Sequence, residues 1–351
     1  MKAKVTPKKK AYTTGNSAVE AKIDELLNTA KVQVDRDKLR EMLVTVMKFN
    51  DDKPLSADVY QMNVTMKEMR YANKVFQPYA NEKKICIFGS ARTKPEEGPY
   101  QAAQKFGALM TKSGYMTITG GGHGIMGAAQ AGAGRERSFA LNIILPFEQR
   151  PNETIDGDEK LITFHYFFTR KLNFLKNSDA IALFPGGFGT MDEGFEVITL
   201  VQTGKSPVMP IVFIDEPGGN FWRTFEHYLH EHLLRDGVIS KDDFKLIKFT
   251  DNLEEAKKEV LNFYYNFHSY RYVGDELVIR LQREVPPGAL RRIAEDFADI
   301  LENTPNNVVV SAPLPEEANE PELAKFPRLR LKFTRRAFGR LRELIDRLNQ
   351  F

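Results

Sequence analysis

Five short apolar runs, separated by longer amphipathic stretches, constrain the fold of this chain most strongly. The runs occupy residues 85–88, 116–119, 139–145, 180–184 and 208–214. Apolar strands that alternate with helices pair in parallel and are buried on both faces. The sequence therefore predicts an α/β fold, a doubly wound parallel sheet with helices on each side.

The segments on either side of this pattern have other periodicities. Residues 1–79 begin with a polar, lysine-rich tail, which we expect to be disordered, and continue with apolar residues at helical spacing. From about residue 270 the pattern is that of a strand, a helix, two strands and a helix. We therefore predict three parts: the tail and helical extension over 1–79, the α/β domain over 80–268, and a small α+β module with its own core over 269–351.

The composition limits the class of protein and its partners. The 50 basic residues nearly balance the 47 acidic ones, so the net charge of +3 favours neither nucleic acid nor a membrane as partner. The single cysteine, Cys86, forms no intrachain disulfide and fits a reducing compartment. The sequence contains neither an apolar run near the roughly 20 residues of a membrane span nor a secretory leader. We expect a cytoplasmic protein.

Glycine-rich turns follow two of the predicted strands. One spans residues 119–127, with the sequence TGGGHGIMG, and the other spans residues 185–190, with the sequence PGGFGT. A glycine turn that opens a helix exposes unpaired backbone N–H groups at the positive end of the helix dipole, where an anion binds. Since the carboxyl ends of parallel strands meet at one edge of a sheet, the two turns together predict one phosphorylated ligand.

Two other interpretations of these glycines are open. They could serve only the tight packing of strand against helix. Gly122, Gly124 and Gly127 also fit a dinucleotide fingerprint, with Glu148 as its ribose ligand. That fingerprint usually follows the first strand of a domain, whereas these glycines follow the second, so the dinucleotide interpretation is disfavoured.

Four motifs together resemble those of the LOG family, whose members were long labelled possible lysine decarboxylases. The motifs are residues 88–92 (FGSAR), residues 120–129 (GGGHGIMGAA), the pair Arg170-Lys171, and residues 185–193 (PGGFGTMDE). The resemblance covers residues 83–265, about half of the chain, and the last motif is a specific signature. It implies a Rossmann-like fold and a homo-oligomer of two or more subunits. We expect no cofactor.

The same resemblance implies an activity. Family members are known as cytokinin riboside 5′-monophosphate phosphoribohydrolases, and bacterial relatives cleave purine or pyrimidine nucleoside 5′-monophosphates more generally. The chain is accordingly expected to hydrolyse AMP-like or cytokinin riboside monophosphates to a free base and ribose 5-phosphate. Residues 167–171 read FFTRK where plant members have Met-His-Glu-Arg-Lys, and this departure leaves the base preference open.

The matched positions supply the expected site. Glu193 is expected to hold the ribose hydroxyls, to activate the water, or both, because an oxocarbenium-like sugar requires a nearby negative charge. Arg170 is expected to orient the nucleotide and to help the base depart. The expected substrate-binding residues lie in the loops and directly after Arg170: Gly89, Ser90, Arg92, Gly121, Gly122, Gly124, Lys171, Gly186, Gly187, Gly189 and Thr190.

Other functions remain open from the sequence alone. A non-catalytic nucleotide-binding carrier or sensor with a Rossmann-like fold is the alternative, although the presence of both Arg170 and Glu193 disfavours it. A decarboxylase would need pyridoxal phosphate on a lysine, and no such lysine context is recognisable. His227, His230 and His232 lack the spacing of a zinc-protease helix, so no metal site is expected there.

The C-terminal module is expected to tune activity, by limiting access to the glycine loops, without supplying a catalytic residue. Every family motif lies between residues 88 and 193. The module carries a basic face, which is either solvated or binds an anionic regulator. The face consists of Arg328, Arg330, Lys332, Arg335, Arg336 and Arg340.

Overall fold

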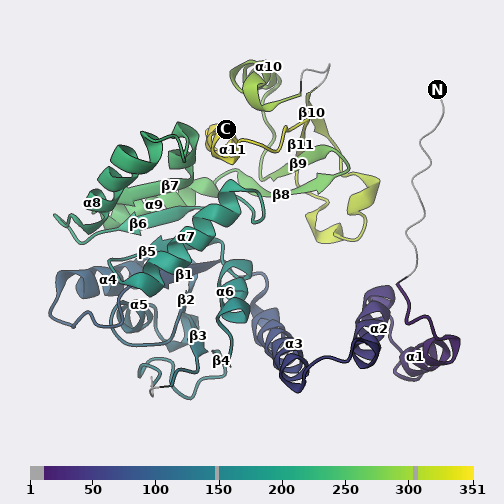
Figure 1. The fold of residues 1–351 in the computed structure, drawn as a ribbon. Coiled ribbons are helices and arrows are strands. Elements are labelled where there is room, and N and C mark those ends of the chain that lie inside the picture. Colours follow the sequence, from purple (N-terminus) through teal and green to yellow (C-terminus); the bar gives the residue numbers. More distant parts are fainter. Residues whose placement is uncertain (1–11, 147–149, 303–306) are drawn as a thin grey trace. The chain divides into compact units, whose positions relative to one another are not determined.

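The computed structural model describes residues 12–146, 150–302 and 307–351 (Figure 1). Most of the predicted lysine-rich tail therefore lies outside the described residues. The chain forms two compact units, Met1–Glu68 and Met69–Phe351. The predicted boundaries at residues 79 and 268 stay predictions. Of the helices described, none combines the length and apolar character that a membrane crossing requires.

The first unit is helical, as the apolar spacing predicts. Its helices are α1 (Ser17–Thr29), α2 (Arg36–Asp52) and most of α3 (Ser56–Phe76). The side chain of Asn16 caps α1 by accepting the backbone N–H groups of Ala18 and Val19. Three buried side chains, Ile23, Leu27 and Val44, form its small core.

The second unit is built on a seven-stranded parallel sheet. Its strands are β1 (Lys84–Phe88), β2 (Met116–Thr119), β3 (Ser138–Ile143), β4 (Leu161–Phe164), β5 (Ala180–Leu183), β6 (Ile211–Ile214) and β7 (Ile247–Thr250). The order across the sheet is β4-β3-β2-β1-β5-β6-β7. The predicted doubly wound α/β fold is confirmed. Since the chain returns from β4 at one edge to β5 beside β1, the strand order reverses between β1 and β5, where such folds bind ligands.

Helices cover both faces of this sheet (Figure 1). They are α4 (Gly98–Lys112), α5 (Ile125–Ala133), α6 (Phe167–Lys176), α7 (Phe188–Gln202), α8 (Phe221–Tyr228) and α9 (Leu253–Phe263). Strand β1 shows how the faces divide: Ile85 and Ile87 pack with α4, α5 and α9, whereas Cys86 and Phe88 pack with α6, α7 and α8. Alternate side chains of a strand point to opposite faces, so a continuous apolar run supplies both layers.

The C-terminal part contains a second, antiparallel sheet with the order β10-β11-β9-β8. Its elements are β8 (Phe267–Val273), β9 (Glu276–Leu281), α10 (Pro287–Asp296), β10 (Val308–Ser311), β11 (Arg328–Leu331) and α11 (Phe338–Leu348). The predicted α+β pattern is present, with β8 as an additional first strand. The sequence pattern does not predict β8, because its residues Phe267–Val273 are mostly half-buried and polar or aromatic, without a clean apolar alternation.

The apolar side chains of this part belong to the same core as the parallel sheet. Leu341, Leu344 and Leu348 of α11 lie in one continuous buried cluster with Phe263 of α9. The Asn349 side chain donates a hydrogen bond to the carbonyl of Phe263, and Arg342 forms an ion pair with Glu259. The separate core expected for residues 269–351 is therefore not found.

Candidate active site

Three loops meet at the reversal in strand order, and Ser90 joins them. The backbone N–H of Ser90, after β1, donates to the carbonyl of Pro185, after β5, over 3.1 Å. The carbonyl of Ser90 accepts the N–H of Ile125, the first residue of α5, over 2.9 Å. The loops that the glycine motifs predict to lie at one sheet edge are thus hydrogen-bonded to one another.

Several of the predicted glycines are required by close packing within these loops. A Cβ atom at Gly89 would lie within 3.0 Å of the Ile125 side chain, and one at Gly186 would lie equally close to Thr190. Gly124 has a φ of +63°, which side chains disfavour, and a Cβ atom there would also clash with the Ser90 carbonyl. Packing therefore requires glycine at these three positions, and Gly89 and Gly186 also line the cavity described below.

Gly187 and Gly189 differ, because a Cβ atom at either would meet open space. Both line a cavity with Ser90, Arg92 and Thr190. Gly187 is the N-cap of α7, whose cap makes no side-chain hydrogen bond, so the first turn of this helix presents its backbone N–H groups at the cavity. The end of α7 therefore suits an anion.

Glu193 lies on the same helix, about one turn further on, and its carboxylate also lines the cavity. Its side chain is 7% exposed, and one carboxylate oxygen lies 3.6 Å from the Arg170 guanidinium. Burial raises the pKa of Glu193 to about 7, although Lys171 and Arg170 act in the opposite direction. A carboxyl group with this pKa can exchange a proton near neutral pH.

Arg170 lies on α6 and lines the same cavity. Its guanidinium lies 5.1 Å from the ring centre of Phe167 and 5.4 Å from that of Phe174. Its Nε–H is buried and has no hydrogen-bond partner among the described residues. Burial lowers the pKa of Arg170, yet a guanidinium stays protonated at neutral pH. The cavity wall thus contains a cation that lies beside two aromatic rings and the Glu193 carboxylate.

Residues 126–260 match the family model described as "Possible lysine decarboxylase". The cytokinin riboside 5′-monophosphate phosphoribohydrolase of Mycobacterium tuberculosis is 31% identical over 158 residues, which are 44% of this chain and 82% of that protein. The chain belongs to the LOG family. A family member from Arabidopsis thaliana is 29% identical over 185 residues, 52% of this chain and 84% of that protein.

The comparison with solved structures also returned a protein outside these named LOG relatives. The molybdenum cofactor carrier protein of Chlamydomonas reinhardtii is 20% identical, and the match covers 51% of this chain and 98% of that one. The TM-score is 0.35, so this likeness supports no conclusion about the function of the chain.

The LOG motifs do not all reach the cavity wall. Gly121, Gly122 and Gly124 lie behind it, where Asn152 holds their loop. The Asn152 side-chain amide donates to the carbonyls of both Gly121 and Gly122, each over 3.0 Å. Asn152 is buried and was not anticipated from the sequence. Glu148, the alternative ribose ligand, lies outside the described residues.

Lys171 of the LOG motif also lies beside the cavity and not in its wall. Its ammonium group contacts Asp192 at 2.9 Å, Glu196 at 2.8 Å and Glu193 at 3.7 Å. Burial lowers the pKa of Lys171, but the hydrogen bonds to Glu196 and Asp192 outweigh it and raise the pKa overall. This geometry connects Lys171 to the charge of Glu193 more directly than to a substrate.

Further cavity residues were missing from the sequence-based prediction. They are mostly apolar and come from α5, α6 and α7 and from the ends of β1, β2 and β3 or the residues just after them. They comprise Phe88, Ala91, Gly120, Met126, Asn142, Ile143, Leu145, Phe167, Phe174, Phe188 and Met191. Only Asn142 carried a usable signal, because it is a polar residue near the carboxyl end of an otherwise apolar run.

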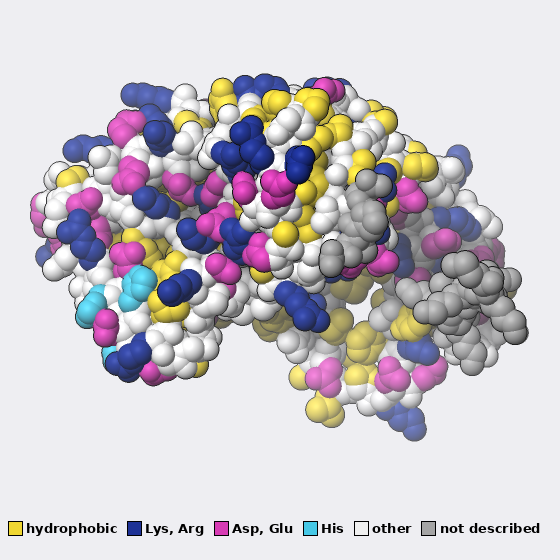
Figure 2. Space-filling view, turned by 90° about the horizontal axis from the view of Figure 1, so that it is seen from above, with side chains coloured by type: hydrophobic (Ala, Val, Ile, Leu, Met, Phe, Trp, Pro, Cys, Tyr) yellow, Lys and Arg dark blue, Asp and Glu magenta, His cyan; other side chains and the backbone are white. Residues whose placement is uncertain are grey.

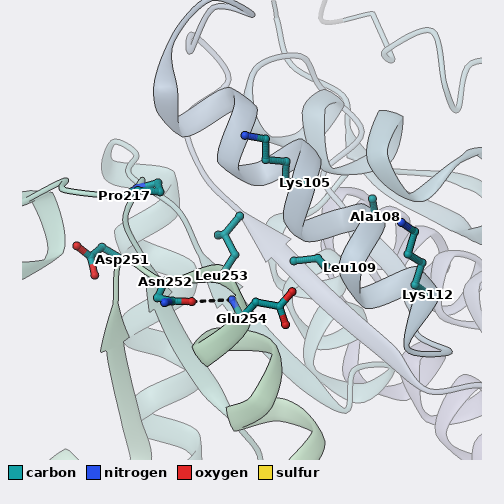
Figure 3. Close-up of a pocket in the computed structure, with 9 residues that line it drawn as sticks. All are labelled: Lys105, Ala108, Leu109, Lys112, Pro217, Asp251, Asn252, Leu253 and Glu254. Carbon is teal, nitrogen blue, oxygen red and sulfur yellow. Dashed lines mark hydrogen bonds between the residues drawn. The ribbon is translucent and has the colours of Figure 1, made fainter.

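A second hollow lies between α4 and the start of α9 (Figure 3). Its walls include Lys105, Lys112, Asp251 and Glu254, so the two signs of charge are balanced. Asn252 already caps α9 by accepting the N–H of Glu254 over 2.9 Å, the dashed bond of Figure 3. This hollow contains none of the LOG motifs, and we place the candidate site in the cavity of Glu193.

The basic residues of the C-terminal part are largely paired. Arg328 is buried against Glu317, while Arg330 and Lys332 both contact Glu276. Figure 2 likewise shows acidic and basic side chains interspersed on the face turned to the viewer. These contacts favour a structural role over the binding of an anionic regulator. In the described part of the chain, no group of three or more His, Cys, Asp or Glu side chains is placed to hold a metal ion.

Proposed function

We propose that this protein hydrolyses the N-glycosidic bond of a nucleoside 5′-monophosphate. Its membership in a family of phosphoribohydrolases identifies the class of enzyme. In the proposed reaction the bond between C1′ and the base nitrogen breaks and water supplies a hydroxyl group to C1′. The base leaves with the proton, and ribose 5-phosphate is the second product. AMP-like and cytokinin nucleotides are the proposed substrates.

The phosphate is proposed to bind at the start of α7. Gly187 and Gly189 allow a close approach to the backbone N–H groups, and Thr190 adds a hydroxyl group at the cavity wall. Arg92, on the loop after β1, is exposed and makes no ion pair within residues 12–146, 150–302 and 307–351. Its guanidinium is therefore available to a phosphate, which it can bind through two parallel hydrogen bonds.

Glu193 is the residue on which the proposal rests. A phosphate at the first turn of α7 places the ribose near the next turn, about 5.4 Å along the helix axis, where the buried carboxylate lies. In its ionised form this carboxylate stabilises the positive charge that develops at C1′ and accepts a proton from the attacking water. Arg170, whose guanidinium lies 3.6 Å from this carboxylate, is proposed to hydrogen-bond the departing base.

A panel of nucleotides tests the proposal directly. The protein is incubated with AMP, GMP, CMP, UMP and a cytokinin riboside monophosphate, and release of ribose 5-phosphate is measured for each. Production of ribose 5-phosphate from at least one of them supports the proposal and reports the base preference. Tight binding without any product would favour the non-catalytic carrier instead.

A nucleoside 5′-monophosphate is expected to be cleaved far better than the matching nucleoside. Without the phosphate, the N–H groups at the start of α7 lose their partner and the sugar loses its anchor, so binding energy that positions C1′ is absent in the transition state. The measurement compares kcat/KM for AMP and for adenosine. Equal values would mean that the glycine loop does not bind the phosphate.

Replacing Lys171 with methionine is expected to move the pH dependence of turnover. The cation lies 3.7 Å from Glu193 and favours its ionised form, so its loss raises the pKa of Glu193 further. The rise of kcat/KM with pH, which reports ionisation of Glu193, should then occur at higher pH. Lys171→Arg keeps the charge and should keep the profile. Identical profiles for Lys171→Met and the unchanged protein would contradict this role.

The homo-oligomer expected from the family resemblance is also a proposal. Helix α6 carries an apolar surface beside the cavity, where Phe167, Phe168 and Leu172 are each about half exposed. Such side chains are typical of surfaces that contact another protein. A cytoplasmic location is proposed on the composition alone.

A further inference from the structure

Asn142 is a buried polar residue in the cavity wall, and its amide orientation is determined by the backbone. It lies near the carboxyl end of β3 and is 7% exposed. Its Oδ1 accepts the backbone N–H of Ile143 over 2.9 Å. Because the oxygen must face this donor, the amide group cannot flip, and the NH₂ group points the other way.

The NH₂ group of Asn142 has no protein acceptor among the described residues. The cavity wall also contains apolar side chains, among them Met126, Ile143, Leu145 and Phe174. When a ligand fills the cavity and excludes water, a donor left without an acceptor is costly. The cavity therefore presents one donor of fixed direction to whatever molecule it binds.

The position of Asn142 in the sheet indicates which end of a nucleotide it would meet. The proposed phosphate site follows β5, whereas Asn142 is on β3, with β1 and β2 between them. Neighbouring strands are about 4.8 Å apart, so the two strands are separated by roughly 14 Å across the sheet. The phosphate and the base are opposite ends of a nucleoside monophosphate. A phosphate held after β5 therefore leaves the base toward β3.

We propose that Asn142 is a specificity-determining residue that donates a hydrogen bond to an acceptor on the base, a ring nitrogen or a carbonyl oxygen. This inference rests on the proposed function. Because Oδ1 is occupied by the Ile143 N–H, Asn142 offers the base only a donor. Asn142 therefore favours binding of a base that has an acceptor at that edge, and it cannot accept a hydrogen bond from an exocyclic amino group.

Asn142→Asp is the test variant, with Asn142→Ala as a second one that adds no charge. The aspartate keeps the acceptor for Ile143 and replaces the donor. Binding of AMP and of ribose 5-phosphate to each protein is measured by calorimetry, together with kcat/KM for AMP. Ribose 5-phosphate contains the sugar and phosphate but no base. Thr163→Val serves as control, since Thr163 pairs with Asn142 in β4 but is exposed and outside the cavity wall.

Both Asn142 variants are expected to bind AMP roughly 5- to 150-fold more weakly, the loss that follows when a buried hydrogen-bonding partner is left unsatisfied. Their affinity for ribose 5-phosphate should be unchanged. Equal losses for both ligands would place Asn142 on the sugar or phosphate and overturn the proposal, as would no loss for either. If the unchanged protein binds AMP without cleaving it, the proposed hydrolysis fails while the binding ratios still decide the role of Asn142. If it binds no nucleotide, both proposals fail.

Discussion

Glu193→Gln is expected to lower nucleotide turnover by roughly 10²–10⁴-fold, the contribution typical of a positioned acid or base. Glutamine keeps the shape of the side chain but carries no negative charge and cannot accept a proton from water. Affinity for the nucleotide should change little, because the phosphate binds at the preceding turn of α7. The measurement combines kcat from ribose 5-phosphate release with nucleotide affinity from calorimetry.

Asp192→Asn provides the matched control for this variant. Asp192 is the preceding residue on α7, contacts the same Lys171, and has a 61% exposed side chain. The Asp192→Asn substitution removes one negative charge from the same helix turn without altering the cavity wall. It should therefore lower turnover far less than Glu193→Gln does. Equal losses for both variants would indicate a general charge effect, and full turnover by Glu193→Gln would exclude Glu193 as the base.

The pH dependence of the free energy of unfolding provides a second measurement on Glu193→Gln. The pKa of Glu193 is about 7 in the folded protein, above the ordinary value of 4.5. Its contribution to stability is therefore present below pH 4.5 and is lost as the pH rises through 7. Glu193→Gln cannot ionise, so its free energy of unfolding should lack this decline between pH 4.5 and 7. Urea unfolding at a series of pH values measures the difference.

A chain that ends at residue 268 is expected to lose cooperative folding and, with it, all turnover. The truncation removes buried residues of β9 and α11, which share one core with the parallel sheet: Leu277, Ile279, Leu281, Leu341, Leu344, Ile345 and Leu348. Losing a single buried leucine side chain typically costs about 2–5 kcal/mol. Whole domains are stable by only about 5–15 kcal/mol. Thermal and urea unfolding, followed by circular dichroism, would show the loss.

A point variant separates this structural role from a role in the active site. Leu344→Ala should reduce the free energy of unfolding by about 2–5 kcal/mol and leave kcat of the folded protein unchanged. Turnover should be unchanged because α11 lies far from the cavity. Phe338 of α11 packs against Gly204, just after the end of α7. The cavity lies at the other end of this 15-residue helix, about 22 Å away. A soluble 1–268 chain that unfolds cooperatively and retains turnover would contradict this account.

The C-terminal module, residues 269–351, therefore differs from the accessory module with its own core that its periodicity predicted. Every residue that lines the cavity lies between Phe88 and Glu193, so residues 269–351 supply none of the wall. Its arginines are mostly held by acids of the same part, as Arg340 is by Asp299. Spacing along a chain shows which residues are apolar together, but not which other segment covers them.

The sequence by itself determined the local features of this protein. The apolar runs predicted five of the seven parallel strands, because buried strands need continuous apolar residues. Strands β4 and β7 were missed, since polar residues interrupt both and most of their residues are incompletely buried. The glycine loops were also predicted, because close backbone approach and positive φ at Gly124 allow few other residues.

Only the tertiary structure decided how these features combine. The strand order places β1 beside β5, which brings Ser90 to Pro185 and assembles the cavity from loops almost 100 residues apart. It also places Lys171 behind Glu193 and turns Asn142 into a cavity donor. Whether a polar side chain is a ligand or a support depends on which groups surround it. That information resides in contacts between distant segments, and the local pattern of residues does not contain it.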